Sequence, residues 1–418
     1  MPKTSITIQK PSFLINGKPT YSEIDGSVEN AHGLLMNARF IQGVFDDKTG
    51  HDRYARWGKA EFDPDRNTDD LIAALPEWYA CGLRAFTVGF QGGGPCFTID
   101  NSTIQNNPFG EDGLEIDPDY AARMDRLIRG ADEIGMAVIV SFFYGAQARR
   151  LRDGKAVRNA VVAACRFLKD YTNVLIEVAN EHNIGAFTDH PIIHSAEGMA
   201  ALMDLARQAS GGMAVGCSGG GGYADREICD ASDFVLIHGN GCSRQRYDNL
   251  IRQAQQWAPD KPVVCNEDSQ CIGQVKVAFA TRTSWGYYNN MTKQEPPADW
   301  RITPGEDTFF ARRMAEGIGI GLPALPEDEQ YYLQGLEPHM EYEGKRWVRL
   351  ASLYPETIDC VDFYRNGEHI CTAYDEPFMV YYRTTWIQNP WMVRPDDREW
   401  KAVIHLCNGD TLEKTVRL

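Results

Sequence analysis

The chain lacks several features that would place it outside the soluble globular proteins. No apolar run approaches the roughly 20 residues that a membrane-spanning helix needs, and residues 1–5 lack the apolar core of a signal peptide. The eleven cysteines show no CxxC spacing, and several fall inside expected strands or helices. Because this pattern argues against a disulfide framework, we expect mostly reduced, buried thiols in a soluble cytoplasmic protein that makes no membrane contact.

Positive charge is also scarce. The sequence has 42 Lys and Arg against 58 Asp and Glu, which gives a formal net charge of −16. A polyanion would be repelled at long range, so neither nucleic acid nor an anionic membrane is an expected partner. The charge does not decide the oligomeric state, and a homo-oligomer stays possible.

Motifs for cofactors and metals are missing as well. The glycine-rich turns at 91–95 and 218–223 have neither the Walker pattern nor the dinucleotide-binding spacing, so we expect no cofactor. His182, His190 and His194 lack HExxH or paired Cys/His spacing, and we expect them in a solvated loop without a metal.

A regular alternation of short apolar runs and amphipathic stretches occupies the first three quarters of the chain. This alternation is typical of βα units around a parallel sheet. Eight strands are expected, and helices fit between them at 68–81, 118–134, 156–171, 196–210, 244–257, 272–281 and 306–317. The expected strands are 34–41, 84–90, 137–143, 174–179, 213–217, 234–238, 262–266 and 284–288. The fold class is therefore α/β, a (β/α)8 TIM barrel.

A change of pattern marks a second domain. The segment 12–19 reads as a hairpin that covers the barrel floor, and after residue 336 period-two alternation replaces the helical pattern, with Asn-Gly turns at 366–367 and 408–409. We expect a catalytic barrel over 1–335, including the hairpin, and a small all-β, immunoglobulin-like sandwich over 336–418. A linker at 321–328 would join them. The aromatic residues Tyr381, Tyr382, Trp386 and Trp391 could form a sugar-stacking platform, but core or interface packing is favoured.

Two carboxylates stand at the carboxyl ends of expected strands. Glu181 follows the apolar run of strand four and Glu267 follows that of strand seven, each preceded by Asn. Barrel enzymes place their chemistry at this end of the strands. A pair of carboxyl groups presented this way favours cleavage of a glycosidic bond.

In this layout the chain resembles the clan A glycoside hydrolases, and family 5 cellulase-like and mannanase-like enzymes in particular. The resemblance implies that Glu181 is the acid/base, Glu267 the nucleophile, and Asn180 a donor to the substrate 2-hydroxyl. Arg39 then matches an arginine beside the nucleophile, and His238 matches a strand-six histidine. The expected function is a retaining β-glycoside hydrolase that acts on a carbohydrate, an oligosaccharide or small glycoside.

Other positions carry weaker expectations. Trp285 on strand eight matches a tryptophan that forms the floor of the sugar subsite, although simple packing is its alternative. Gln91, Tyr144, Asn240 and Asp268 stand next to the expected centre and could contact sugar hydroxyls. The long insertions 42–67 and 289–305 favour an enclosed pocket over an open cleft.

The chain also departs from the family pattern. His182 follows Glu181 where a proline is common, and strand three ends without a histidine. A divergent relative within the clan fits best. A transglycosylase that uses the same pair and a non-catalytic carbohydrate-binding protein on a decayed barrel stay open as alternatives. A barrel enzyme of unrelated chemistry is disfavoured because no lysine stands convincingly at a strand end.

Overall fold

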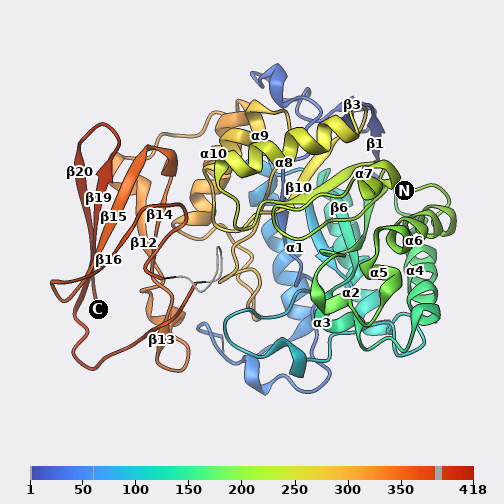
Figure 1. The fold of residues 1–418 in the computed structure, drawn as a ribbon, viewed down its shortest axis with the longest axis horizontal. Coiled ribbons are helices and arrows are strands. Elements are labelled where there is room, and N and C mark those ends of the chain that lie inside the picture. The colour runs from blue at the N-terminus through green and yellow to red at the C-terminus, as the bar shows by residue number, and fades with distance from the viewer. Residues whose placement is uncertain (1, 60, 382–387) are drawn as a thin grey trace.

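The parallel strands expected from the sequence are present. The computed structural model describes residues 2–59, 61–381 and 388–418 (Figure 1). Two of the expected strands and two of the expected helices have the predicted bounds, and the others shift or shorten by a few residues. The strands are β4 (Asn37–Arg39), β5 (Ala85–Gly89), β6 (Ala137–Phe143), β7 (Val174–Ala179), β8 (Val215–Gly216), β9 (Val235–His238), β10 (Val263–Glu267) and β11 (Gly286–Tyr287).

These strands lie side by side in chain order. β4 to β8 form one parallel sheet, and β11 pairs with the outer edge of β4. β9 and β10 form a second parallel pair. Two isolated bridges, Val264–Ser284 and Asp268–Tyr287, connect this pair to the β11 segment. Among the described residues β8 and β9 share no ladder, and only isolated bridges join β10 to the β11 segment, so the expected closed barrel is not closed. The glycine-rich stretch that follows Cys217 leaves the sheet early, and β8 ends at Gly216.

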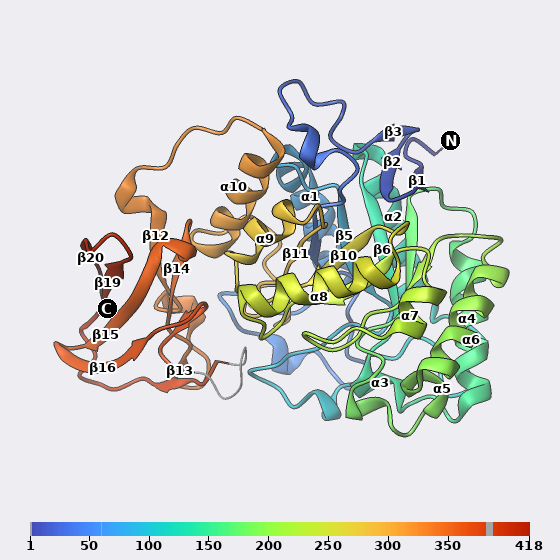
Figure 2. The same ribbon diagram turned by 45° about the horizontal axis from the view of Figure 1, so that its top comes forward.

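Helices connect the strands and cover the outside of the sheet (Figure 2). A large apolar core lies between the two layers. α3, α5 and α7 are short and were not expected from the sequence. The helices are α1 (Pro64–Ala80), α2 (Pro118–Ile134), α3 (Gly145–Ala148), α4 (Gly154–Leu168), α5 (Pro191–His194), α6 (Ala196–Ala209), α7 (Arg226–Ala231), α8 (Arg244–Trp257), α9 (Gln274–Ala280) and α10 (Glu306–Ile318).

The N-terminal hairpin closes the amino ends of the strands. β1 (Ile6–Gln9), β2 (Ser12–Ile15) and β3 (Lys18–Pro19) form a small antiparallel sheet. Phe13 is fully buried and shares an apolar cluster with Leu175 and Phe234 from the parallel strands. Because the hairpin covers this end, the opposite end carries the exposed βα loops.

In the described residues that follow α10, nine short strands are present. They form three antiparallel sheets, ordered β12-β14-β17, β13-β18 and β16-β15-β19-β20, which are drawn in orange to red in Figure 1. Leu350 of β14, Phe363 of β15 and Trp400 of β19 share one apolar cluster, so two of these sheets pack on each other. The bounds are β12 (Tyr331–Gln334), β13 (Lys345–Arg346), β14 (Arg349–Ser352), β15 (Ile358–Arg365), β16 (Glu368–Ala373), β17 (Phe378–Met379), β18 (Trp391–Met392), β19 (Glu399–Leu406) and β20 (Thr411–Arg417).

β12 lies before the expected domain boundary at 335/336, yet it pairs with β14. Polar contacts tie this region to the helical layer. Arg349 forms an ion pair with Glu306 at the start of α10, and the Gly273 N–H donates to Glu376 over 2.7 Å. The two regions are therefore held together by buried and partly buried charges.

The expected aromatic platform is only partly described, because Tyr382 and Trp386 lie outside the described residues. Tyr381 and Trp391 stack with ring centroids 5.3 Å apart, and the Trp391 ring meets Trp400 edge-on at 6.0 Å. Trp391 thus packs on the apolar cluster of the C-terminal sheets, whereas Tyr381 is exposed.

Two further expectations concern the burial of the cysteines and the presence of membrane-spanning helices. Six of the cysteines are buried, at positions 165, 217, 229, 242, 265 and 271. Over the described part of the chain, no helix combines the length and apolarity that spanning a membrane requires.

Candidate active site

Glu181 stands in an unusual backbone conformation just beyond β7. Its φ is 55°, in the left-handed region that non-glycine residues rarely occupy. Such a residue costs on the order of 1–3 kcal/mol, and strain of this kind clusters at functional sites. Ser218 holds the turn, because its hydroxyl accepts from the Glu181 N–H over 3.1 Å and its carbonyl accepts from the His182 N–H over 3.1 Å.

Glu267 reaches the same end of the sheet through a β-bulge. Cys265 lies opposite Ile237 and Glu267 opposite His238, so Asn266 is an extra residue in β10. In a regular strand, Asn266 and Glu267 would point to opposite faces. The bulge re-aims them, and both side chains contact buried polar groups within the parallel sheet.

Arg39 organises the carboxylates from β4. Its Nε lies 2.5 Å from Glu267 Oε2, and its Nη1 lies 3.7 Å from Glu177 Oε2. A second terminal nitrogen donates to Asn180 Oδ1. Burial alone would lower the pKa of Arg39, but Glu267 and Glu177 outweigh it and raise that pKa. A fixed cation therefore sits between two carboxylates in the interior.

Glu181, His238 and Glu267 converge. One carboxylate oxygen from each glutamate and one ring nitrogen of His238 all lie within 4.8 Å of one another. His238 Nδ1 is 3.0 Å from Glu181 Oε1 and 3.9 Å from Glu267 Oε2. Burial would lower the pKa of His238, but Glu267 and the hydrogen-bonded Glu181 raise it. The imidazole thus joins the two carboxylates.

The two glutamates have different surroundings. Glu267 is 7% exposed, is paired with Arg39, and accepts from Asn240 Nδ2 over 2.6 Å. The Glu181 side chain is 19% exposed, and its only hydrogen bond in the described structure is to His238. The Glu267 carboxylate is thus held by an ion pair and an amide, and the Glu181 carboxylate by a histidine.

Two other expected residues lie close by. Gln91 holds the backbone at Tyr144 in place. Its side-chain carbonyl accepts from the Tyr144 N–H over 3.0 Å, and its amide donates to Asn107 over 2.8 Å. Burial raises the pKa of the Tyr144 phenol well above its usual range, and Cys96, Glu267 and Glu181 raise it further. The Tyr144 hydroxyl therefore shares the electrostatic surroundings of the glutamates, whereas Gln91 positions the backbone.

Trp285 is not brought to this group. Its ring is fully buried, 5.3 Å from the Phe310 ring of α10, and its indole N–H donates to Asp268 over 2.8 Å. This placement favours packing, the alternative that the sequence left open. Its stacking role on a sugar stays a prediction.

Replacing Asp268 with asparagine is expected to make stability less dependent on pH. Burial raises the pKa of Asp268 well above its usual range, so the folded protein keeps a proton there that the unfolded chain releases above about pH 4. The free energy of unfolding of the unmodified protein therefore falls as pH rises from about 4 toward the raised pKa, and asparagine avoids this loss. Calorimetry should show the Tm difference moving in favour of D268N with rising pH. A constant difference would contradict the prediction.

Two residues of the site, Glu177 and Tyr288, had no place in the sequence analysis. Glu177 is fully buried in β7 and accepts from Ser218 Oγ over 2.7 Å and from Asn266 Nδ2 over 3.0 Å. Tyr288, directly after β11, places its ring 5.9 Å from the Arg39 guanidinium. The signal for Glu177 was a single charge inside an otherwise apolar strand. Tyr288 was marked only by its position at a strand end.

The three converging groups could also hold a cation, since their donor atoms lie close together. Arg39 already balances the Glu267 charge, which disfavours a divalent ion there.

His182 and His190 do not lie in a solvated loop as expected. They are 2% and 4% exposed, so that prediction is wrong for both. His190 Nε2 lies 2.9 Å from the Ala148 carbonyl of α3, because this segment folds back over the short helix.

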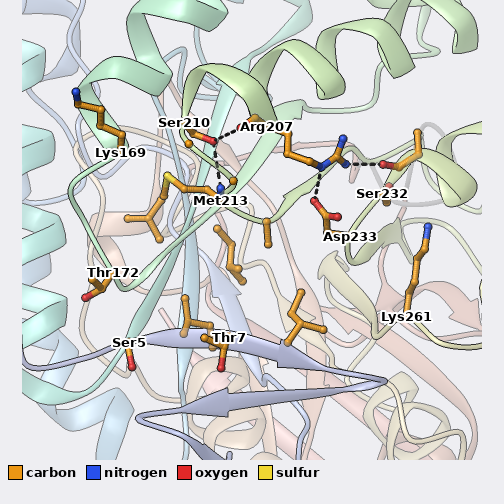
Figure 3. Close-up of a pocket in the computed structure, with 18 of the residues that line it drawn as sticks. Ser5, Thr7, Lys169, Thr172, Arg207, Ser210, Met213, Ser232, Asp233 and Lys261 are labelled. Carbon is orange, nitrogen blue, oxygen red and sulfur yellow. Dashed lines mark hydrogen bonds and ion pairs between the residues drawn. The ribbon is translucent and has the colours of Figure 1, made fainter.

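A cavity of about 950 Å³ lies at the opposite end, beside the N-terminal hairpin (Figure 3). Two of its cations have partners. Arg207 donates to Asp233 over 3.1 Å, and Lys261 donates to the Asp230 carbonyl over 2.7 Å. Because this cavity is lined from the amino ends of the strands, it is separate from the glutamate pair.

Comparisons with known proteins give distant similarities only. No protein-family model matches the sequence, and no curated protein matches it. The solved structures similar to it include glycoside hydrolases, β-glucuronidases and β-mannanases, in agreement with the resemblance seen in the sequence.

Three of these structures illustrate the range of identity and coverage. Bacteroides uniformis β-glucuronidase 2 bound to cyclophellitol-6-carboxylate aziridine has 10% identity over 99% of this chain and 48% of that chain, at a TM-score of 0.47. The Cryptopygus antarcticus β-1,4-D-mannanase has 14% identity over 75% and 95%, at 0.48. The Eisenia fetida endo-1,4-β-mannanase has 15% over 76% and 95%, at 0.47. The chain spans about half the length of the glucuronidase. At such low similarity, the roles of Glu181 and Glu267 rest on their own geometry.

Proposed function

We propose that the protein is a retaining β-glycoside hydrolase that acts on an oligosaccharide or small glycoside. The observation that carries the proposal is the approach of the two carboxylates, which brings one oxygen of Glu181 within 4.8 Å of one of Glu267. Retaining enzymes hold their carboxyl groups about 5–5.5 Å apart, whereas inverting enzymes leave about 6.5–9.5 Å for a water. The spacing supports a direct attack on the sugar.

The surroundings support the division of roles. Arg39 and Asn240 hold Glu267 as an oriented anion, which suits a nucleophile that attacks the anomeric carbon. Glu181 is more exposed and lies beside His238, so it can donate a proton to the leaving oxygen. Glu181 then removes a proton from the water that hydrolyses the glycosyl-enzyme. Asn180 accepts from Arg39 through its carbonyl, which leaves its amide N–H groups for a substrate hydroxyl.

The same proposal covers the architecture. We assign the eight parallel strands to a (β/α)8 barrel with an open seam between β8 and β9, and the C-terminal sheets to a β-sandwich. The pairing of β12 with β14 supports a boundary before Tyr331, upstream of 335/336. The catalytic end of the barrel is then the end opposite the hairpin.

The test follows product anomers by NMR across a panel of aryl β-glycosides and oligosaccharides. Retention of configuration is expected, and inversion would remove the nucleophile role of Glu267. Turnover should survive treatment with a chelator. Transfer to an added sugar acceptor in preference to water would identify a transglycosylase, and sugar binding without turnover would favour a decayed barrel.

A further inference from the structure

A second cavity lies between segments that are far apart in the sequence. It has a volume of about 490 Å³ and lies between the loop after β4, the loop after β11 and the region around β12. Both loops leave the carboxyl ends of their strands, the end at which Glu267 lies. The β11 loop begins directly after Tyr288, whose ring faces Arg39, and continues to Met291 in the cavity wall. The C-terminal region thus completes a cavity at the catalytic end.

The wall contains polar atoms without partners. Trp57 Nε1, Thr292 Oγ1 and Gln334 Oε1 are buried and make no hydrogen bond with the described residues. Gln334 is only 7% exposed. An unpaired buried polar group is destabilising. The three atoms together offer a donor, a donor-acceptor and an acceptor, a set that a ligand rich in hydroxyl groups satisfies.

The wall also contains an aromatic side chain in a fixed position. Trp57 has a φ of 58°, and its ring lies 6.0 Å from the Tyr342 ring and 5.8 Å from the Arg56 guanidinium. Met291 and Met340 belong to the apolar cluster against which Trp57 packs. An indole held in advance of binding supplies a face for sugar C–H groups at low entropic cost.

The charged wall residues already have partners. Arg301 donates to both oxygens of Asp299, over 2.9 and 2.6 Å. Lys59 donates to the Ala298 carbonyl over 2.9 Å, and Glu337 accepts from the Tyr332 hydroxyl over 2.8 Å. Arg301 is paired with Asp299, and Lys59 also lies 3.7 Å from Asp70, so these two cations of the wall already face acidic side chains and the wall favours a neutral ligand.

We propose that this cavity is a distal subsite that binds a neutral oligosaccharide. The proposal rests on the hydrolase function above and deepens it, because the C-terminal region would then select for chain length. Trp57 would stack on a sugar ring, and Gln334 would accept from a hydroxyl.

The first experiment compares kcat and KM of Trp57→Ala and Gln334→Leu on an aryl β-glycoside and on β-1,4-linked gluco- and manno-oligosaccharides of increasing length. The loss in kcat/KM should grow with chain length, to about tenfold for Trp57→Ala on the longest, which is about 1.4 kcal/mol. It should appear in KM, and Trp57→Phe should restore most of it. Tyr374→Ala and Gln245→Leu, at exposed positions, serve as controls. Equal losses at all lengths, or none, would overturn the subsite.

The second experiment separates the subsite from the hydrolase. Calorimetry measures the binding of the same oligosaccharides to Glu267→Gln, with and without Trp57→Ala or Gln334→Leu. Weaker binding in the cavity variants supports the subsite even if the unmodified protein hydrolyses none of the sugars, a result that would count against the hydrolase alone. Unchanged affinity, no binding of any oligosaccharide, or tighter binding of uronic-acid-terminated chains would overturn the neutral subsite.

Discussion

Replacing Glu267 with glutamine is expected to lower kcat on an aryl β-glycoside by about 10⁴-fold or more, the scale on which removing a covalent nucleophile acts. The amide cannot form the glycosyl-enzyme, and it can accept from only one of its present donors, Arg39 or Asn240, at full strength. The measurement is steady-state turnover on a panel of leaving groups. The loss should be similar for good and poor leaving groups, since every substrate needs the nucleophile.

Glu181 should behave differently. Glu181→Ala removes the proton donor, so poor leaving groups should lose about 10²–10⁴-fold in kcat/KM while a dinitrophenyl glycoside loses little. Deglycosylation then becomes slow, because no base activates water. Added azide should restore turnover and give the β-glycosyl azide, since it needs no base and attacks the same intermediate.

The control for both variants is Glu197→Gln, an exposed glutamate of α6. It should keep near-normal turnover and the same Tm. If Glu267→Gln retained turnover on the substrate that the unmodified protein hydrolyses best, the nucleophile assignment would be wrong. If azide gave the α-azide with Glu181→Ala, the two roles would have to be exchanged.

Local signals predicted much of the fold. The 118–134 helix has the expected bounds because Asp117 caps its first turn and Gly135, at φ 89°, ends it. β6 and β7 have the expected bounds because they are central strands whose apolar runs are interrupted only by Ser141 and Glu177. β8 keeps only Val215–Gly216 of the expected strand 213–217, and the glycine-rich stretch that follows accounts only for the loss at its end. The six-residue α7 is too short to show a helical period.

The site was predictable only in part. Strand ends pointed to Glu181 and Glu267 because parallel strands gather their carboxyl ends at one edge. The strand count could not show that a bulge at Asn266 re-aims Glu267, or that the buried Glu177 shares Arg39 with it. The distal cavity had no local signal, because its walls come from segments more than two hundred residues apart.

Arg39 should be the residue of the site on which stability depends most. Replacing it with methionine leaves Glu177, fully buried, and Glu267, 7% exposed, near each other without a cation. Breaking a buried ion pair by removing one partner costs about 3–5 kcal/mol, because the remaining charge is uncompensated. Glu177→Gln should cost less, since Arg39 keeps Glu267 as its partner. Chemical denaturation of each variant measures these costs. Arg226→Met, an exposed arginine of α7, is the control and should change stability little.

The double variant R39M/E177Q separates the structural part of this network from its catalytic part. In the R39M background Glu177 has lost its cation, so Glu177→Gln removes an unbalanced buried charge instead of a partner. The double variant should therefore be more stable than R39M alone, with a coupling energy of about 1 kcal/mol or more between the two sites. Turnover should stay low in both, because Glu267 still lacks the cation that orients it. If Glu177→Gln destabilised both backgrounds equally, Glu177 would act through its hydrogen bonds to Ser218 and Asn266, and its charge would not be what Arg39 balances.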